Sequence, residues 1–223
     1  MQHKKQENTL SHFKYKVPAF RVILSKMMEI KIIDKSSLSL SLTEERKGLP
    51  KEVLSHSLSY ALEEDKENSL LAYLTLFNRL KKEGIPSSSI KYTDRGKPYR
   101  DNGIHFSFSH SKNRIAVRIS SDECGIDIQE IENKNFDPIA KRILSDREYS
   151  LYLSSLDKPL SIISGWVRKE AYLKRKGTGI LSLSGLKEID LDLPSILIRD
   201  KEGNRYCYSY TAFRIYPCFS LPA

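Results

Sequence analysis

Several features that would assign this chain to a common class are missing from its sequence. No apolar run approaches the roughly 18 residues that a membrane-spanning helix needs. No continuous apolar segment follows the lysines of the first 16 residues, so a secretory signal is not predicted either. Cysteine is scarce, and Cys124, Cys207 and Cys218 have no zinc-site spacing. We therefore expect reduced thiols in a cytoplasmic protein that has no membrane partner.

The common sequence motifs of phosphate-binding loops and of nucleophilic serine turns are absent as well. The sequence contains neither Gly-x-Gly-x-x-Gly nor a Walker-type Gly-Lys-Ser/Thr, so it lacks the usual glycine-rich phosphate loops. It also lacks the Gly-x-Ser-x-Gly turn of serine hydrolases. No zinc finger or aromatic-rich RNA-binding motif is recognisable. A phosphate-binding function would therefore need a different kind of site.

The chain has an excess of positive charge. Its 37 basic and 28 acidic residues give a formal net charge of +9, with 39% hydrophobic and 29% charged residues. That balance is typical of a globular protein. A basic surface favours an anionic partner, such as a nucleic acid, a phosphorylated small molecule, an acidic protein or an anionic membrane. Charge alone does not choose among them.

Regular patterning covers most of the chain after a polar and basic extension over residues 1–27. Strands are predicted over 29–34, 38–42, 104–109, 115–120 and 125–129, and again near the end, with a hairpin through 200–204. Helices are predicted over 51–63, 66–82, 138–153 and from about 161 to 176, and residues 87–103 are predicted to be a loop. Strand and helix patterns occur both before and after Ser120. We therefore expect two α+β halves, residues 28–120 and 121–223.

A short strand after the midpoint carries two polar side chains on one face. In Gly125–Gln129 the isoleucines would point inward, and Asp127 and Gln129 would emerge together on the opposite face. Two neighbouring oxygen-bearing groups can hold a hard cation such as Mg²⁺. A strand with one solvated face explains the same pattern.

A helix near residue 170 places a carboxylate on an apolar stripe. Glu170 lies four residues after Trp166 and three before Leu173, so it is expected to be partly buried and to need a partner. Lys174 is one turn further on and can reach the same place. The two residues could form a simple helix ion pair, or they could hold a metal ion and a phosphate together.

The strand at 104–109 ends in a group of hydroxyl and imidazole donors. Apolar residues alternate inward, and His105, Ser107 and Ser109 share the opposite face. The following His110 adds a second imidazole at the strand end. Such donors can bind an anion. Adjacent residues of a strand diverge, which argues against a Ser-His hydrolase pair.

The order of these motifs is more specific than any one of them. The chain contains, in sequence, Gly96-Lys97-Pro98, Phe108-Ser109-His110-Ser111, Gly125-Ile126-Asp127-Ile128 and Trp166-x-x-Lys169-Glu170-Ala171-x-x-Lys174. In this order and at these spacings the chain resembles the surfactin-synthetase-activating (Sfp-like) class of 4′-phosphopantetheinyl transferases. Residues 139–148 are also similar to the segment that lies between the last two motifs of that family. The resemblance extends from about Met28 to the C-terminus.

The resemblance implies a fold and a reaction. The fold would be an α+β pseudo-dimer of two similar halves, with the active site in the cleft between them. The enzyme would be a Mg²⁺-dependent holo-[acyl-carrier-protein] synthase. It would transfer 4′-phosphopantetheine from coenzyme A to a serine of an apo acyl or peptidyl carrier protein, releasing 3′,5′-ADP. Residues 28–120 would bind coenzyme A, and residues 121–223 would bind Mg²⁺ and carry the catalytic groups. A monomer would suffice.

The resemblance also implies roles for individual residues. Asp127 and Glu170 would bind Mg²⁺ together with Gln129, and Glu170, Lys174 and His110 would be catalytic. The coenzyme A contacts would come from Lys97, Ser109, His110, Lys174 and Ser69. Lys169 matches a lysine of the family motif and would have a supporting electrostatic role.

Three departures from the family pattern leave alternatives open. Gln129 stands where a glutamate is usual, and Asn68 stands where an arginine that helps hold the nucleotide phosphate is common. Residues 1–27 have no counterpart. One alternative is therefore a degenerate family member that binds coenzyme A or a carrier but no longer transfers. The other, from a different class, is a basic nucleic-acid-binding protein, for which steeply salt-dependent binding would be the evidence.

Overall fold

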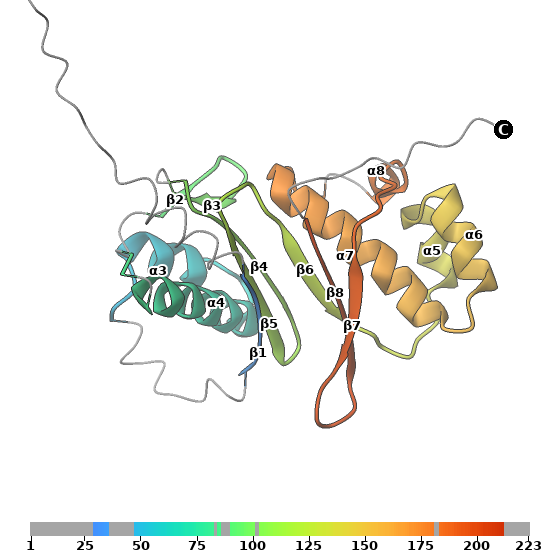
Figure 1. Cartoon of the computed structure of the whole chain (residues 1–223), viewed down its shortest axis with the longest axis horizontal. Helices are drawn as coiled ribbons and strands as arrows, with labels where there is room; N and C mark the ends of the chain where they lie inside the picture. Colours follow the sequence, from blue (N-terminus) through green and yellow to red (C-terminus); the bar gives the residue numbers. More distant parts are fainter. Residues whose placement is uncertain are drawn as a thin grey trace, which may run out of the picture.

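A computed structural model of the chain describes residues 29–35, 47–82, 84–85, 90–100, 103–180 and 183–211. The extension over residues 1–27, the strand expected over 38–42 and Cys218 lie outside these described residues. The described part has two sides, each made of a small antiparallel sheet with helices on its outer flank (Figure 1).

The first side is built by residues before Ser121. Its elements are β1 (Glu29–Asp34), α3 (Lys51–Leu58), α4 (Glu63–Lys82), β2 (Lys91–Tyr92), β3 (Pro98–Tyr99), β4 (His105–Ser111) and β5 (Arg114–Ser120). Strand β5 lies between β1 and β4 in one antiparallel sheet, and β2 and β3 form a separate two-stranded ribbon. Helix α4 packs on β4 and β5 through an apolar stripe whose residues Leu70, Leu71, Leu74, Phe77 and Leu80 are all buried.

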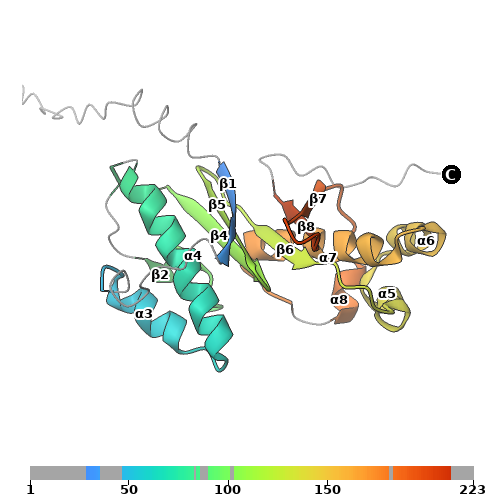
Figure 2. The same ribbon diagram turned by 90° about the horizontal axis from the view of Figure 1, so that it is seen from below.

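The second side is built by the rest of the described chain. Its elements are β6 (Ile126–Glu130), α5 (Asp137–Ile143), α6 (Asp146–Ser154), α7 (Lys158–Lys176), α8 (Leu183–Lys187), β7 (Ser195–Arg199) and β8 (Arg205–Tyr210). The strand order is β6-β8-β7, all antiparallel. Helix α7 lies along β6 and β8, and α5, α6 and α8 gather beyond it (Figures 1 and 2).

The two sheets meet where β4 runs beside β6. Three backbone N–H groups of β6 donate to three serine hydroxyls of β4: Ile126 to Ser107 at 3.2 Å, Ile128 to Ser109 at 3.3 Å and Glu130 to Ser111 at 2.9 Å. Serine side chains thus take the place that a neighbouring strand's carbonyl groups would have at the edge of β6. We call this set of hydrogen bonds the serine joint. It satisfies buried backbone donors that would otherwise be left without partners.

An apolar layer between the sheets supports the serine joint. Ile126 and Ile128 are fully buried, as their alternation predicted, and they pack with Ala116 and Tyr206. The guanidinium group of Arg118 on β5 lies 4.8 Å from the ring centroid of Tyr210 on β8, a cation–π contact between the two sheets. The relative position of the two sides is therefore fixed by packing as well as by hydrogen bonds.

Most predicted elements are present, with shifted boundaries. Strand β1 has the predicted bounds, and the hairpin through 200–204 joins β7 to β8. The pattern over 138–153 is divided into α5 and α6 because Ser145 caps α6 in a capping box with Glu148. The predicted loop 87–103 contains the β2–β3 ribbon, and α8 was not predicted. None of the described helices is long and apolar enough to cross a membrane.

Candidate active site

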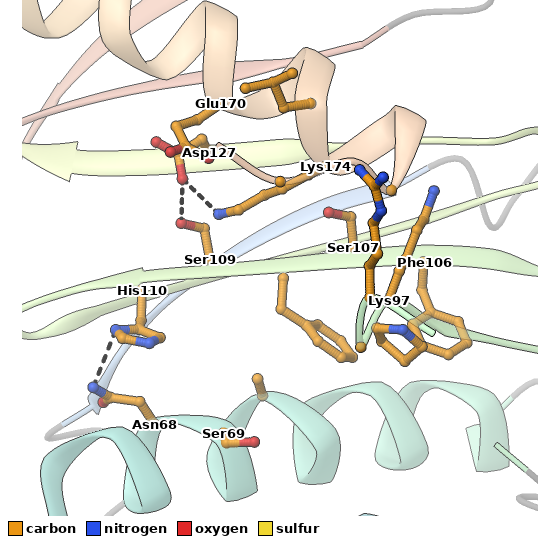
Figure 3. Close-up of a pocket in the computed structure, with 18 of the residues that line it drawn as sticks. Asn68, Ser69, Lys97, Phe106, Ser107, Ser109, His110, Asp127, Glu170 and Lys174 are labelled. Atoms are coloured by element: carbon orange, nitrogen blue, oxygen red, sulfur yellow. Dashed lines mark hydrogen bonds and ion pairs between the residues drawn. The ribbon is translucent and has the colours of Figure 1, made fainter. Parts of the chain in front are cut away.

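A cleft of about 530 Å³ lies where the two sides face each other. Side chains from α3, α4, β4, β6 and α7 line it, together with residues of the Arg95–Pro98 turn. Figure 3 shows polar groups converging from three elements, Asp127 from β6, Glu170 and Lys174 from α7 and Ser109 from β4, while His110 lies on the other side of β4 and faces Asn68. All residues that the sequence predicted to be catalytic, metal-binding or coenzyme A-binding line this one cleft.

Asp127 is at the centre of the polar group. Its residue is only 5% exposed, and its Oδ1 atom accepts two hydrogen bonds. The hydroxyl of Ser109 donates at 2.7 Å, and the ammonium group of Lys174 donates at 2.6 Å. On the face of β6 that the sequence predicted to be polar, Asp127 is therefore packed against α7 and β4, and Gln129 is half-buried at the cleft.

Glu170 lies on the side of α7 that faces Asp127. Burial raises the pKa of the Glu170 carboxyl above its ordinary value, and the nearby charge of Asp127 raises it further. The charge of Lys174 acts in the opposite direction. The ion pair that the Lys174 ammonium forms is therefore with Asp127 on another element, and not the helix pair with Glu170.

A close approach of backbones holds α7 against β6. A Cβ atom on Gly125, just before β6, would lie 1.9 Å from the carbonyl oxygen of Ala171 and 2.7 Å from the amide nitrogen of Arg175. Only glycine leaves room for the helix at this position. The helix ends at Gly177 in the left-handed region, with φ of 69°, which places Lys174 in the last turn.

His110 points away from the serine joint and toward α4. Its Nδ1 atom lies 3.1 Å from Nδ2 of Asn68, which is almost fully buried. Burial lowers the pKa of His110, and the charge of Lys174 lowers it further. If the amide nitrogen donates, the histidine proton is on Nε2. Asn68, the residue that departs from the family's arginine, therefore contacts His110 at the cleft wall.

The other predicted coenzyme A contacts have partners of their own. The Lys97 ammonium donates to the carbonyl oxygen of Arg175, and burial lowers the Lys97 pKa. Ser69 on α4 shares a 2.8 Å hydrogen bond with Ser57 on α3. Both residues line the cleft, and Lys97 also connects the β2–β3 ribbon to the end of α7.

The structure places Lys169 differently from the role expected for it. Its side chain is 1% exposed and forms a 2.6 Å ion pair with Glu148 of α6. It also donates to the carbonyl oxygen of Ile189. Lys169 is not among the residues that line the cleft. Adjacent helix residues point about 100° apart, so a lysine next to Glu170 can serve the contact between α6 and α7 instead.

The donor atoms in the cleft fit a magnesium ion. Asp127 and Glu170 supply carboxylates, and Gln129 supplies an amide oxygen on the same face of β6. In the described part of the chain, no three His, Cys, Asp or Glu residues cluster as a complete metal site. Mg²⁺ is usually held by one or two carboxylates together with water and substrate phosphates, so two carboxylates are adequate.

Several cleft residues were not predicted from the sequence. They are His56, Tyr60, Tyr73 and Arg95. The rings of His56 and Tyr92 stack with centroids 4.3 Å apart, and Tyr60 meets His56 edge-on at 5.6 Å. The one available signal was the spacing of His56 and Tyr60, four residues apart at the end of a helix. Nothing in that spacing distinguishes a cleft wall from a core contact.

Comparison with known proteins gives matches to one kind of enzyme. Residues 123–215 match the family model of the 4′-phosphopantetheinyl transferase superfamily. A protein of Haemophilus influenzae, provisionally named a 4′-phosphopantetheinyl transferase, is 32% identical over 156 residues, which are 63% of this chain and 66% of that protein. The 4′-phosphopantetheinyl transferase HetI of a Nostoc species is 33% identical over 121 residues, 49% of this chain and 50% of the relative.

A third relative gives the same result over a shorter span. The 4′-phosphopantetheinyl transferase gsp of Aneurinibacillus migulanus is 34% identical over 101 residues, 43% of this chain and 42% of the relative. The matches thus span between 42% and 66% of the relatives' lengths. The matched segment 123–215 contains β6, α7 and β8, and with them Asp127, Glu170 and Lys174. The segment over residues 123–215 is a domain of the 4′-phosphopantetheinyl transferase superfamily. The antiparallel sheets with their flanking helices agree with the α+β fold of that superfamily.

Proposed function

We propose that this protein is a Mg²⁺-dependent 4′-phosphopantetheinyl transferase of the surfactin-synthetase-activating class. It transfers 4′-phosphopantetheine from coenzyme A to a serine of an apo acyl or peptidyl carrier protein and releases 3′,5′-ADP. The observation that carries the proposal is the convergence of Asp127 and Glu170, from two elements, with Lys174 in one cleft.

The carboxylates have separate tasks in this reaction. Asp127, Glu170 and Gln129 would hold Mg²⁺, which when bound neutralises charge on the pyrophosphate of coenzyme A. The serine oxygen bonds to the β-phosphorus while the bond from that phosphorus to the bridging oxygen breaks, so that 3′,5′-ADP leaves. Glu170, or a water molecule that it orients, accepts the proton of the serine hydroxyl.

The cationic and neutral donors position the nucleotide. Lys174 stabilises negative charge that develops on the phosphoryl and leaving oxygens. His110, kept neutral by its lowered pKa, donates a hydrogen bond to a phosphate oxygen, as the Ser109 hydroxyl can do. Lys97, from the turn before β3, and Ser69, from α4, complete the contacts to coenzyme A. On this assignment residues 28–120 and 121–223 both contribute to the substrate site.

The proposed partner fits the charge of the chain. Carrier proteins are typically acidic, and this chain has a net charge of +9. Opposite charges accelerate encounter and select the orientation of docking. A monomer contains both walls of the cleft, and we propose that the protein acts as a cytoplasmic monomer.

Intact-mass analysis of apo carrier proteins tests the proposed reaction. Several carriers are incubated with coenzyme A, Mg²⁺ and the protein, and a metal-free reaction is run beside them. A phosphopantetheine-sized gain in mass that needs Mg²⁺ is expected. Asp127→Asn and Glu170→Gln should each remove most of the gain. Asp146→Asn, which changes a carboxylate that pairs with Lys187 on α8, should retain it.

The alternative of a binding protein without transfer makes a different prediction. Its grounds are Gln129, which contributes no charge to the metal, and Asn68, which contributes none to the nucleotide. Such a protein would bind coenzyme A in a calorimetric titration and yet modify no carrier. If Gln129→Glu then produced transfer at low Mg²⁺, weak metal binding would be the cause of the inactivity.

A further inference from the structure

The Lys174 ammonium group is bound to one oxygen of the Asp127 carboxylate, which is a group proposed to hold the metal ion. It lies 2.6 Å from Oδ1 of Asp127, and the Ser109 hydroxyl is bonded to the same atom at 2.7 Å. With two donors on Oδ1, a divalent cation could bind this atom only after a donor left (Figure 3). The Lys174 ammonium group and a divalent cation at the same carboxylate oxygen would also repel each other, because both are positively charged.

Of the two donors, Lys174 is the one able to leave. Ser109 is buried and is fixed on the other side by the N–H of Ile128. The Lys174 side chain is 31% exposed, and its flexible stem arises from the last turn of α7, beside the open cleft. A phosphate group in the cleft would offer the ammonium a more negative partner than one carboxylate oxygen.

We propose that the Lys174 ammonium group pairs with the Asp127 carboxylate in the empty cleft and moves to the phosphates of coenzyme A when coenzyme A binds. This inference rests on the proposed function, because it takes a pyrophosphate-bearing donor and a divalent cation as the ligands of the cleft. Lys174 thereby weakens metal binding when coenzyme A is absent and no longer does so when coenzyme A is bound.

The consequence is a coupling between the two ligands. If bound coenzyme A removes Lys174 from Asp127, it raises the affinity of the cleft for the divalent cation. By linkage, the cation raises the affinity for coenzyme A by the same factor. Couplings of this kind commonly change affinity about 5- to 150-fold. A divalent cation and a bridging pyrophosphate attract each other in any case. The part due to Lys174 is therefore the part that a Lys174 variant loses.

The test measures binding of Mn²⁺, a hard cation that suits carboxylate sites. Its dissociation constant is measured by electron paramagnetic resonance, with and without coenzyme A and with no carrier present. For wild type we expect weak binding that coenzyme A strengthens about tenfold. Lys174→Gln should bind Mn²⁺ several-fold more tightly without coenzyme A, and it should gain less when coenzyme A is added.

A matched variant separates displacement from a general change in charge. Lys97→Gln also removes one positive charge from the cleft, but Lys97 donates to the Arg175 carbonyl and is not bonded to Asp127. Its Mn²⁺ affinity without coenzyme A should stay within about twofold of wild type, because solvent screens charges that are not in contact. Lys174→Met provides a second variant, and thermal melts verify that each one folds.

Each outcome has one meaning for the inference. Equal Mn²⁺ affinity in Lys174→Gln and wild type without coenzyme A would overturn it. An equal rise in affinity in Lys97→Gln would do the same. If Mn²⁺ binding depends on Lys174 as expected but no carrier protein gains mass, the inference stands and the proposed transfer fails.

Discussion

The hydroxyl of Ser109 connects the serine joint to the carboxylate of Asp127. It accepts from the N–H of Ile128 at 3.3 Å and donates to Oδ1 of Asp127 at 2.7 Å. The Ser109 hydroxyl that helps hold the two sheets together therefore also orients the carboxylate at the centre of the cleft. Ser107 and Ser111 take part in the joint at either side of it.

Ser109→Ala should affect both stability and metal binding. It leaves the buried N–H of Ile128 without an acceptor, which costs about 1–3 kcal/mol of the free energy of unfolding. It also removes a donor from Asp127, so the carboxylate is less well oriented. Denaturant unfolding measures the first effect, and Mn²⁺ titration measures the second. Ser111→Ala is the control, since it loses the 2.9 Å bond from Glu130 and no bond to Asp127. A similar change in Mn²⁺ affinity in both variants would contradict the role given to Ser109.

The local part of this arrangement could be predicted from the sequence. Strict alternation in residues 104–109 and 125–129 showed which side chains share a face, because side chains of a strand point alternately to its two sides. The motif order then indicated that Asp127 and Glu170 belong to one site. The structure confirms the alternation, since the two isoleucines are buried, and both carboxylates line one cleft, while their membership of a functional site stays a prediction.

The contacts between elements that are distant in the sequence could not be predicted in the same way. Lys174 and Asp127 are 47 residues apart, and Asn68 and His110 are 42 apart. Periodicity gives the face of an element and not the element that will cover it. The sequence therefore left two alternatives for Lys174, a helix pair with Glu170 or a place beside a metal ion and a phosphate, and it gave Lys169 only a supporting electrostatic role. Tertiary packing pairs Lys174 with Asp127 and Lys169 with Glu148.

Glu170→Gln should stabilise the folded protein at neutral pH in metal-free buffer. The pKa of Glu170 is raised in the folded state, so the folded chain binds more protons than the unfolded chain between the ordinary value of 4.5 and the raised one. Stability therefore falls as the pH rises through that interval. Glutamine does not ionise and avoids this loss. Thermal melts should show a higher midpoint for the variant at pH 7, by a few degrees, and no gain below about pH 4.

The same variant is expected to lose transfer activity. Glutamine can neither accept the serine proton nor supply the charge of a metal-binding carboxylate. A gain in stability combined with a loss of activity is typical of a residue that is retained for function at a cost to folding. A variant that was less stable than wild type at pH 7 would show that Glu170 has a structural contact that outweighs its burial.

Gly125→Ala should separate α7 from β6. The added methyl group would overlap the backbone of Ala171 and Arg175, and backbone atoms have no alternative rotamer. Overpacking of this kind costs about 1–3 kcal/mol, measured as a loss in the free energy of unfolding. Because Glu170 lies beside Ala171, affinity for coenzyme A and Mn²⁺ should fall as well. Gly165→Ala is the comparison, since the atoms nearest to its methyl group belong to the side chains of Leu144 and Glu148 and not to the backbone. An equal or larger loss at Gly165 would refute the close approach as the cause.

Lys169→Met should reduce stability and leave ligand binding close to wild type. Lys169 and Glu148 are 1% and 3% exposed, and removing one member of a buried ion pair costs about 3–5 kcal/mol when the other is left unpaired. Glu148 keeps Arg168 at 3.2 Å and the N–H of Ser145, so a loss near the lower end is expected. Dissociation constants for coenzyme A and Mn²⁺ should change less than twofold at a temperature where the variant is folded, because solvent and distance screen a charge outside the cleft.

Lys174→Met should show the reverse, with altered binding and little loss of stability, because its side chain is partly exposed. If Lys169→Met changed metal binding as strongly as Lys174→Met, the family motif's first lysine would belong to the site after all.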